Sequence, residues 1–229
     1  MAADDCSNGL PRPVQDYSLR GKALKVQTDS AMGVAGVLWP AQERCAEVVA
    51  QTLMELTAQP AARSEGIDFL ELGAGCGAMA CAFASEPSLK RVIASDLPSV
   101  LPLMSQTAQL NDAAVECKAL PFGDIQALEL LKLGPVRLIV ACEVVYWGGW
   151  DMLAQDTVEP LVKTLSCALD APLAVAVLAA EIRDGHREFW FLGKLEERGI
   201  RCWRKLPDAF SPGVGELGIW LLQKSSFKY

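Results

Sequence analysis

The amino-acid sequence predicts an α/β fold with a Rossmann-like, doubly wound sheet of seven strands, mostly parallel and ending in an antiparallel strand. Short apolar runs alternate with helical segments from residue 67 onward, which is typical of βαβ units. The runs 138–142 and 174–178 lack polar alternation, as expected for central parallel strands that are covered on both faces. The last two strand candidates, 201–206 and 217–223, are joined by a loop too short for a crossover helix, so they are antiparallel if they are neighbours.

The other elements follow in order along the chain. Strands before the final pair are expected at residues 23–28, 67–72, 91–95, 115–120, 138–144 and 173–180. Helices are expected at residues 41–56, 76–85, 99–110, 125–131, 152–168 and 187–198. Pro40 suits the first turn of the first helix, where its missing N–H costs nothing. Residues 1–22 contain Pro11 and Pro13 without periodicity, so we expect a loosely ordered extension there and a single domain over residues 23–229.

The composition excludes several classes of protein. Hydrophobic residues make up 51% of the 229 positions, which is enough for one buried core. A net charge of −7 argues against nucleic-acid binding, because phosphate contacts need clustered Lys and Arg. The 8 cysteines form no Cys-x-x-Cys pair and there is 1 histidine, so no metal site is expected and a reducing compartment suits the thiols. With no signal-peptide pattern and no apolar run of ~18 residues, we expect a cytoplasmic monomer with no membrane partner.

A glycine-rich turn, Glu71–Gly77, lies between the first strand of the alternating region and the following helix. Glycines there let the backbone pass close beneath a ligand, because they carry no Cβ. The pattern Gly73-x-Gly75-x-x-Ala78 also satisfies the NAD fingerprint, with Asp96 as the acid at the end of the second strand. Both NAD and S-adenosylmethionine contain adenosine, so in either case Asp96 is expected to bind the ribose hydroxyls. The alternative for Asp96 is a helix N-cap.

Three features favour S-adenosylmethionine. Glu71, two residues before Gly73, completes a Glu-x-Gly-x-Gly-x-Gly motif suited to the amino-acid end of that cofactor, which has an ammonium group and no pyrophosphate. The second feature is the antiparallel pair of strands at the end of the chain. The third is the acid-x-x-Tyr sequence, Glu143 to Tyr146, at the end of the fourth strand of the alternating region. The expected cofactor-binding residues of this region are Glu71, Gly73, Ala74, Gly75 and Asp96. A glycine turn that binds nothing is the remaining alternative.

Five segments together resemble the lysine methyltransferases of the methyltransferase-16 family, which are related to enzymes that methylate chaperones and elongation factors. These segments are Gly33–Trp39, Glu71–Gly77, Asp96, Leu120–Gly123 and Ala141–Tyr146. The resemblance spans about residues 24–223. It implies a methyltransferase that uses S-adenosyl-L-methionine and acts on a protein presenting an exposed lysine.

The resemblance also implies roles for three cofactor-binding residues outside the turn. Trp39 would pack on the cofactor. Phe122 stands where the family often has a Trp against the adenine, and its ring keeps an apolar face for stacking. Ala141 stands where a small residue contacts the cofactor.

Glu143 and Tyr146 would act at the acceptor amine. Free lysine has a pKa of ~10.4, so presenting a neutral amine near pH 7.4 costs about 4 kcal/mol. A channel lined by Tyr146, Trp147 and Trp150 would lower that pKa and attract the cation through its aromatic faces. Glu143 would orient the amine by hydrogen bonding, although the family most often has Asp at this position. The extra methylene leaves the identity of the substrate open.

Further expectations concern the rim of the crevice and other interpretations of the sequence. The residues Glu181–Arg183 are expected at the rim of the crevice on the substrate side. Three other interpretations stay open: a strand-end cap for Glu143, a small-molecule methyltransferase on the same fold, and a noncatalytic module that binds the cofactor and serves as a partner of a chaperone or translation factor.

Overall fold

A computed structural model describes residues 13–145, 158–182, 185–205 and 216–224. The strands are β1 (Val14–Leu19), β2 (Lys22–Gln27), β3 (Ile67–Leu72), β4 (Leu89–Asp96), β5 (Glu116–Ala119), β6 (Val136–Cys142), β7 (Leu173–Ile182), β8 (Ile200–Lys205) and β9 (Glu216–Lys224). The α-helices are α1 (Ala41–Thr57), α2 (Pro60–Glu65), α3 (Ala78–Phe83), α4 (Leu101–Leu110), α5 (Ile125–Leu130), α6 (Val158–Ala168) and α7 (Gly185–Glu197). Two 3-10 segments, η1 (Ser30–Gly36) and η2 (Pro98–Val100), precede α1 and α4.

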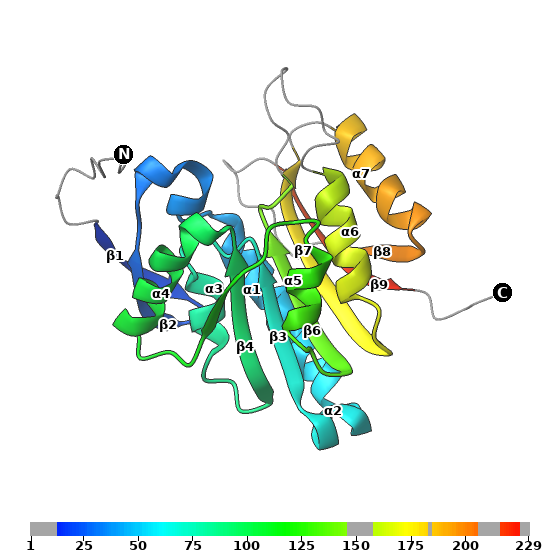
Figure 1. Cartoon of the computed structure of the whole chain (residues 1–229), viewed down its shortest axis with the longest axis horizontal. Helices are drawn as coiled ribbons and strands as arrows, with labels where there is room; N and C mark the ends of the chain where they lie inside the picture. Colours follow the sequence, from blue (N-terminus) through cyan, green and yellow to red (C-terminus); the bar gives the residue numbers. More distant parts are fainter. Residues whose placement is uncertain (1–12, 146–157, 183–184, 206–215, 225–229) are drawn as a thin grey trace.

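The predicted seven-strand sheet is confirmed, with strand order β5-β4-β3-β6-β7-β9-β8. The neighbours from β5 to β7 pair in parallel, whereas β9 pairs antiparallel with both β7 and β8. After β3 the chain builds outward through β4 and β5, and it then returns to place β6 on the other side of β3 (Figure 1). Ligands of open α/β sheets bind outside the carboxyl ends of the strands at such a reversal.

The N-terminal hairpin differs from the expectation. Val14–Leu19 is a strand, paired with Lys22–Gln27, so the predicted loose extension is wrong for this part of the chain. Arg20 and Gly21 both have positive φ, 55° and 71°, as a two-residue hairpin turn requires. The hairpin packs on α3 and α4, and Arg20 pairs with Glu86, in the loop that follows α3, at 2.8 Å. Only this long-range packing makes the short strand stable.

Two apolar cores lie on the two faces of the sheet. Residues of β3 alternate between them: Phe69 belongs to the core under α1, α3 and α4, and Leu70 belongs to the core under α5, α6 and α7. Every residue of β3 is buried, as is typical of a strand covered on both faces. The sequence did not predict α2 or η1. Both are short and lack the periodicity by which a longer helix is recognised.

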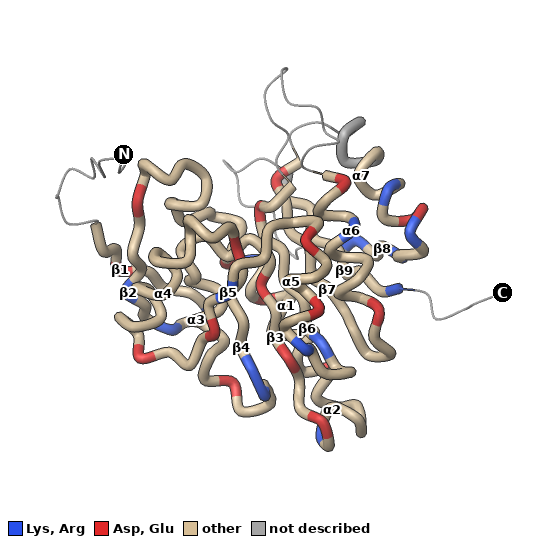
Figure 2. Tube along the Cα trace, viewed as in Figure 1, with Lys and Arg blue, Asp and Glu red and all other residues tan. Residues whose placement is uncertain are grey.

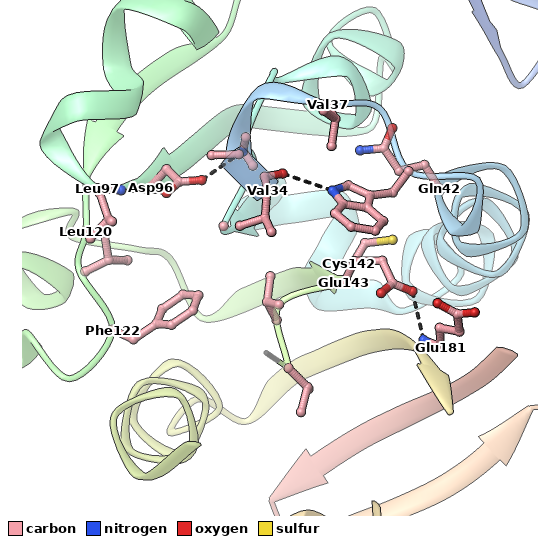
Figure 3. Close-up of a pocket in the computed structure, with 17 residues that line it drawn as sticks. Val34, Val37, Gln42, Asp96, Leu97, Leu120, Phe122, Cys142, Glu143 and Glu181 are labelled. Carbon is pink, nitrogen blue, oxygen red and sulfur yellow. Dashed lines mark hydrogen bonds between the residues drawn. The ribbon is translucent and has the colours of Figure 1, made fainter. Parts of the chain in front are cut away.

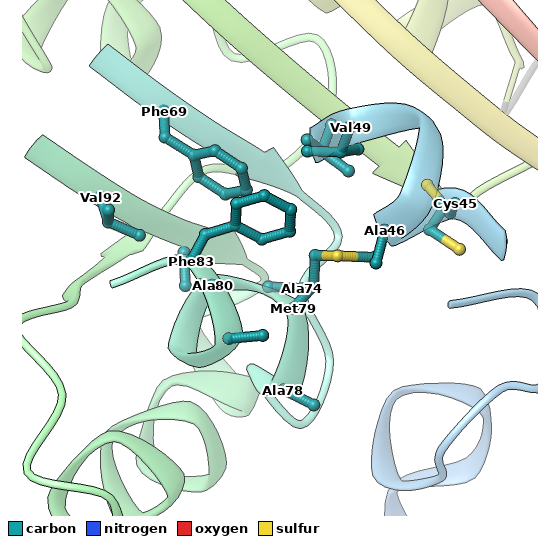
Figure 4. Packing of buried hydrophobic residues seen from close by; sticks show 14 of the residues in the cluster. Cys45, Ala46, Val49, Phe69, Ala74, Ala78, Met79, Ala80, Phe83 and Val92 are labelled. Carbon is teal, nitrogen blue, oxygen red and sulfur yellow. The ribbon is translucent and has the colours of Figure 1, made fainter. Parts of the chain in front are cut away.

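An aromatic pair closes the first core. The rings of Phe69 and Phe83 stack with centroids 5.3 Å apart, next to Met79, Val49 and Val92 (Figure 4). Both rings are fully buried. The pair joins β3 to α3, and so it fixes the two elements that flank the glycine turn.

We expect Phe83→Ala to lower the free energy of unfolding by about 3–5 kcal/mol, because it removes a buried ring and leaves a cavity. Urea denaturation followed by circular dichroism measures this loss. Met54→Ala is the control, since Met54 lies on α1 with 75% of its surface exposed and should change the stability by no more than about 0.5 kcal/mol. Equal losses for the two variants would contradict the proposed importance of the stacked pair.

Candidate functional site

A cavity of about 300 Å³ opens at the carboxyl ends of the central strands. Its walls come from the segments that follow β3, β4, β5 and β6, from the end of β7, and from the segment that leads into α1 (Figure 3). The residues predicted for the site that line it are Trp39, Gly73, Ala74, Gly75, Asp96, Phe122 and Glu143. The structure therefore brings together side chains that are more than 100 residues apart in sequence.

The glycine turn forms the floor of the cavity. Gly73 and Gly75 have positive φ, 67° and 53°. A Cβ on Gly73 would lie 2.6 Å from Cγ1 of Val144, and one on Gly75 would lie 2.9 Å from the carbonyl oxygen of Ala35. Both the backbone conformation and the available space thus require glycine at these two positions.

Asp96 connects the turn to the end of β4. Its Oδ2 accepts a hydrogen bond from the Gly75 N–H at 2.8 Å, and its Oδ1 accepts one from the Leu97 N–H at 2.7 Å. Burial raises the pKa of Asp96, although the two N–H donors oppose this shift. Each carboxylate oxygen has a second lone pair, so Asp96 keeps acceptor capacity for hydroxyl groups in the cavity.

The segment before α1 passes over the turn. The Ala35 carbonyl oxygen accepts a hydrogen bond from Sγ of Cys76 at 3.5 Å. Asp29 caps the segment through the Ala31 N–H at 3.0 Å. The indole Nε1 of Trp39 donates to the Val34 carbonyl oxygen at 3.0 Å, which fixes the ring along the cavity wall.

Two glutamates occupy the wall formed by β6 and β7. Glu143 has φ +56°, a conformation that costs energy in a residue with a Cβ. It is held there by its N–H, which donates to the Ala179 carbonyl oxygen at 2.8 Å, and by its Oε1, which accepts from the Glu181 N–H at 2.8 Å. Glu181, expected at the rim, lines the cavity too. Strained residues of this kind often occur at functional sites.

The two glutamates lie on the opposite side of the cavity from Asp96 and Phe122 (Figure 3). The cavity therefore has two distinct ends. Tyr146, Trp147 and Trp150, which were predicted to complete the glutamate end, lie outside the described residues.

Glu71 and Ala141 do not line the cavity, although both were expected to contact a cofactor. Glu71 is 2% exposed, and its Oε2 accepts a hydrogen bond from the Ala80 N–H at 2.9 Å. Burial raises the pKa of Glu71 to about 8. In this arrangement Glu71 supports the start of α3 from behind the turn, and a direct ligand contact would need its side chain to rotate. Ala141 is fully buried in the central strand.

Sequence reasoning missed Gln42 in the wall. This residue of the first turn of α1 lines the cavity and is 7% exposed. The sequence feature that could have indicated Gln42 is its position three residues after Trp39, near the start of a predicted helix. Residues three apart lie on the same face of a helix. The apolar residues Leu97, Leu120 and Cys142 also line the cavity. Leu120 and Cys142 belong to segments that carry the family resemblance, although neither was expected to contact a ligand, and no sequence pattern marked Leu97.

Basic residues are interspersed with acidic ones along the described elements (Figure 2). In the same part of the chain, no group of 3 or more His, Cys, Asp and Glu side chains is arranged to hold a metal ion. None of the helices described has both the length and the apolar character needed to traverse a lipid bilayer.

A family model described as lysine methyltransferase matches residues 18–198 of the chain. The match includes the glycine turn, Asp96, Glu143 and Glu181. A comparison with curated protein sequences gave no match.

Several solved structures share the fold. An O-methyltransferase family protein from Burkholderia thailandensis is 13% identical, with a TM-score of 0.52 over 80% of this chain and 58% of its own. A 16S rRNA N2 G1207 methyltransferase from T. thermophilus, in complex with AdoMet and guanosine, is 18% identical, with a TM-score of 0.62 over 93% of this chain and 50% of its own. Magnesium protoporphyrin IX methyltransferase from Synechocystis, with bound SAM, is 15% identical, with a TM-score of 0.52 over 83% of this chain and 86% of its own. This chain thus spans 58% of the length of the O-methyltransferase family protein and 50% of the length of the rRNA methyltransferase.

We expect Glu71→Gln to flatten the dependence of stability on pH. The folded state keeps the Glu71 carboxyl protonated up to about pH 8, whereas the unfolded chain ionises it near pH ~4.3. The free energy of unfolding of the wild type should therefore fall as the pH rises between these values, by up to about 1.4 kcal/mol per unit, and level off above them. Urea denaturation from about pH 5 to pH 9 measures both curves.

Glu129→Gln is the matched control, since Glu129 is exposed on α5 and should keep the wild-type slope. Parallel curves for the wild type and Glu71→Gln would show that Glu71 is ionised in the folded protein.

Proposed function

The chain belongs to the lysine methyltransferase family, and from that membership we propose that it transfers the methyl group of S-adenosylmethionine to a lysine side-chain amine of a protein. One observation carries the proposal. A single cavity places the carboxylate of Asp96 at one end and those of Glu143 and Glu181 at the other. The first end suits a ribose, and the second suits a cationic amine.

The residues at the Asp96 end fit the adenosine part of the cofactor. Asp96 would accept hydrogen bonds from the ribose hydroxyls, and Phe122 would offer its ring to the adenine. Gly73 and Gly75 leave the floor open, because neither carries a Cβ. Trp39 would cover the cofactor from the side of α1. When bound, S-adenosylmethionine supplies an electrophilic methyl group on a sulfonium sulfur.

The residues at the other end would prepare the amine. Burial in the cavity lowers the pKa of a lysine, which favours the neutral form needed for attack. Glu143 would accept a hydrogen bond from the amine, and the Glu181 N–H would keep the Glu143 carboxylate in place. Holding the nitrogen in line with the methyl group would account for much of the rate enhancement. The entropy of aligning the two groups is then lost on binding and no longer adds to the activation barrier. Tyr146 would complete this end by attracting the incoming cation.

We expect the protein to bind S-adenosylmethionine with micromolar affinity and not to bind NAD. Isothermal titration with each cofactor measures this difference. Asp96→Asn should weaken S-adenosylmethionine binding about 10- to 100-fold, because it removes charge-assisted hydrogen bonds. Glu129→Gln should leave the affinity unchanged. Binding of NAD alone would replace the proposed function with that of a dehydrogenase.

We expect Glu143→Gln to lower methyl transfer about 100-fold while cofactor affinity stays within about twofold of the wild type. The amide can still accept from the Glu181 N–H, so the variant removes the charge and keeps the fold. Transfer of a tritiated methyl group to proteins of a cell lysate, followed by acid hydrolysis and identification of methyl-lysine, measures the activity.

Glu143→Asp tests the residue more common in the family and should keep part of the activity. Full turnover by Glu143→Gln would exclude the proposed role of Glu143. Label found only in small molecules would point to a small-molecule methyltransferase.

A further inference from the structure

We propose that Gln42 binds the amino-acid end of S-adenosylmethionine, an inference that rests on the proposed function. Gln42 stands in the first turn of α1, where its backbone N–H donates to the Trp39 carbonyl oxygen at 3.1 Å. Its side chain lines the cavity and is only 7% exposed. The inference follows from the lack of a hydrogen-bond partner for the oxygen of its amide group.

The amide oxygen of Gln42 is buried and has no hydrogen-bond partner. Buried polar atoms of native proteins are nearly always paired, since removing them from water without a partner is costly. The described residues contain one other such atom, Oδ1 of Asp68, but that carboxylate already accepts from the Gly134 N–H at 2.7 Å. An unpaired amide oxygen in a residue of the cavity wall therefore points to a partner that arrives with the ligand.

The position of Gln42 in the cavity indicates which part of the cofactor it contacts. Gln42 lies on the side of the cavity opposite to Asp96 and Phe122, which would hold the ribose and the adenine (Figure 3). The segment leading into α1 also packs directly on the glycine turn, since Cys76 donates to the Ala35 carbonyl oxygen. Gln42 thus faces the portion of a bound cofactor that extends past the ribose over the turn.

The chemistry of an amide matches that portion. The amino-acid end of the cofactor carries an ammonium group and a carboxylate, and a glutamine amide offers an acceptor to the first and a donor to the second. The described residues form no hydrogen bond with Oε1 of Gln42, and the terminal torsion of glutamine is broad, so the amide can rotate to present either group. Glu71, the acid expected to bind the ammonium, lies behind the turn and leaves this role open.

The acceptor lysine is the competing partner for Gln42. The glutamate end already provides two carboxylates for a cationic amine, and carboxylates bind cations more strongly than a neutral amide does. An amide is of most use where one ligand presents both charges. We therefore assign Gln42 to the cofactor.

The test compares two ligands that differ only in the amino-acid end. S-adenosylhomocysteine carries that end, whereas 5′-methylthioadenosine has the same nucleoside and thioether without it. We expect Gln42→Met to weaken binding of S-adenosylhomocysteine at least about tenfold and binding of 5′-methylthioadenosine less than about twofold, measured by isothermal titration of the full chain. Gln42→Asn, which keeps the amide but shortens its reach, should show the same selective loss if Gln42→Met fails to fold.

Gln51→Met is the matched control, because Gln51 is exposed on the same helix and should bind both ligands as the wild type does. Equal weakening of both ligands by Gln42→Met would overturn the inference in favour of a general packing role. Unchanged affinity for S-adenosylhomocysteine, with a raised KM for the protein acceptor, would assign Gln42 to the lysine instead. A folded wild type that binds neither ligand would overturn the proposed function itself.

Discussion

The site depends on one hydrogen bond, from the Gly75 N–H to the carboxylate of Asp96 at 2.8 Å. It joins the turn after β3 to the end of β4, and two neighbouring bonds support it: the Ala74 N–H donates to the Ser95 carbonyl oxygen at 2.9 Å, and Oγ of Ser95 donates to the Glu71 carbonyl oxygen at 2.7 Å. The backbone of the turn is thereby fixed before a ligand arrives. The same carboxylate that fixes the turn also faces the cavity, so structure and proposed cofactor binding share one residue.

The polar groups of the cavity are costly to bury, and this cost explains its arrangement. Burial raises the pKa of Asp96, which lines the cavity, and that of Glu71, which lies behind the glycine turn, and the backbone N–H groups that bind the two carboxylates oppose the shift. Glu143 adopts a positive φ of 56° and is held there by bonds to β7. A ligand with complementary groups would offset the cost of burying the Asp96 carboxylate, because it supplies partners that water no longer provides. This arrangement supports the proposed ligand, which has hydroxyl groups at one end and a cationic group at the other.

Local sequence patterns predicted most strands of the sheet and the part of the site formed by the glycine turn and Asp96. The apolar runs of β3, β6 and β7, the glycine turn and Asp96 at a strand end are short-range features, so the sequence alone displays them. The strand predicted at residues 23–28 corresponds to β2, but its partner β1 was missed, because the hairpin becomes stable only by packing on helices such as α3 and α4. Glu71 was correctly placed before the turn, but its side-chain direction depends on the helix that follows. Tyr146 stays a prediction, since it lies outside the described residues.

The sequence by itself determined the alternation of strands and helices, the position of the glycine turn and the residues at the carboxyl ends of the strands. Each of these features depends on a few adjacent residues. Only the tertiary structure decided that β9 inserts between β7 and β8, since strand order depends on pairing between distant segments. It also decided that Glu71 lies behind the turn and that Gln42 lines the cavity. Which side chains meet at a site is set by how helices pack on a sheet, and that packing is a property of the whole chain.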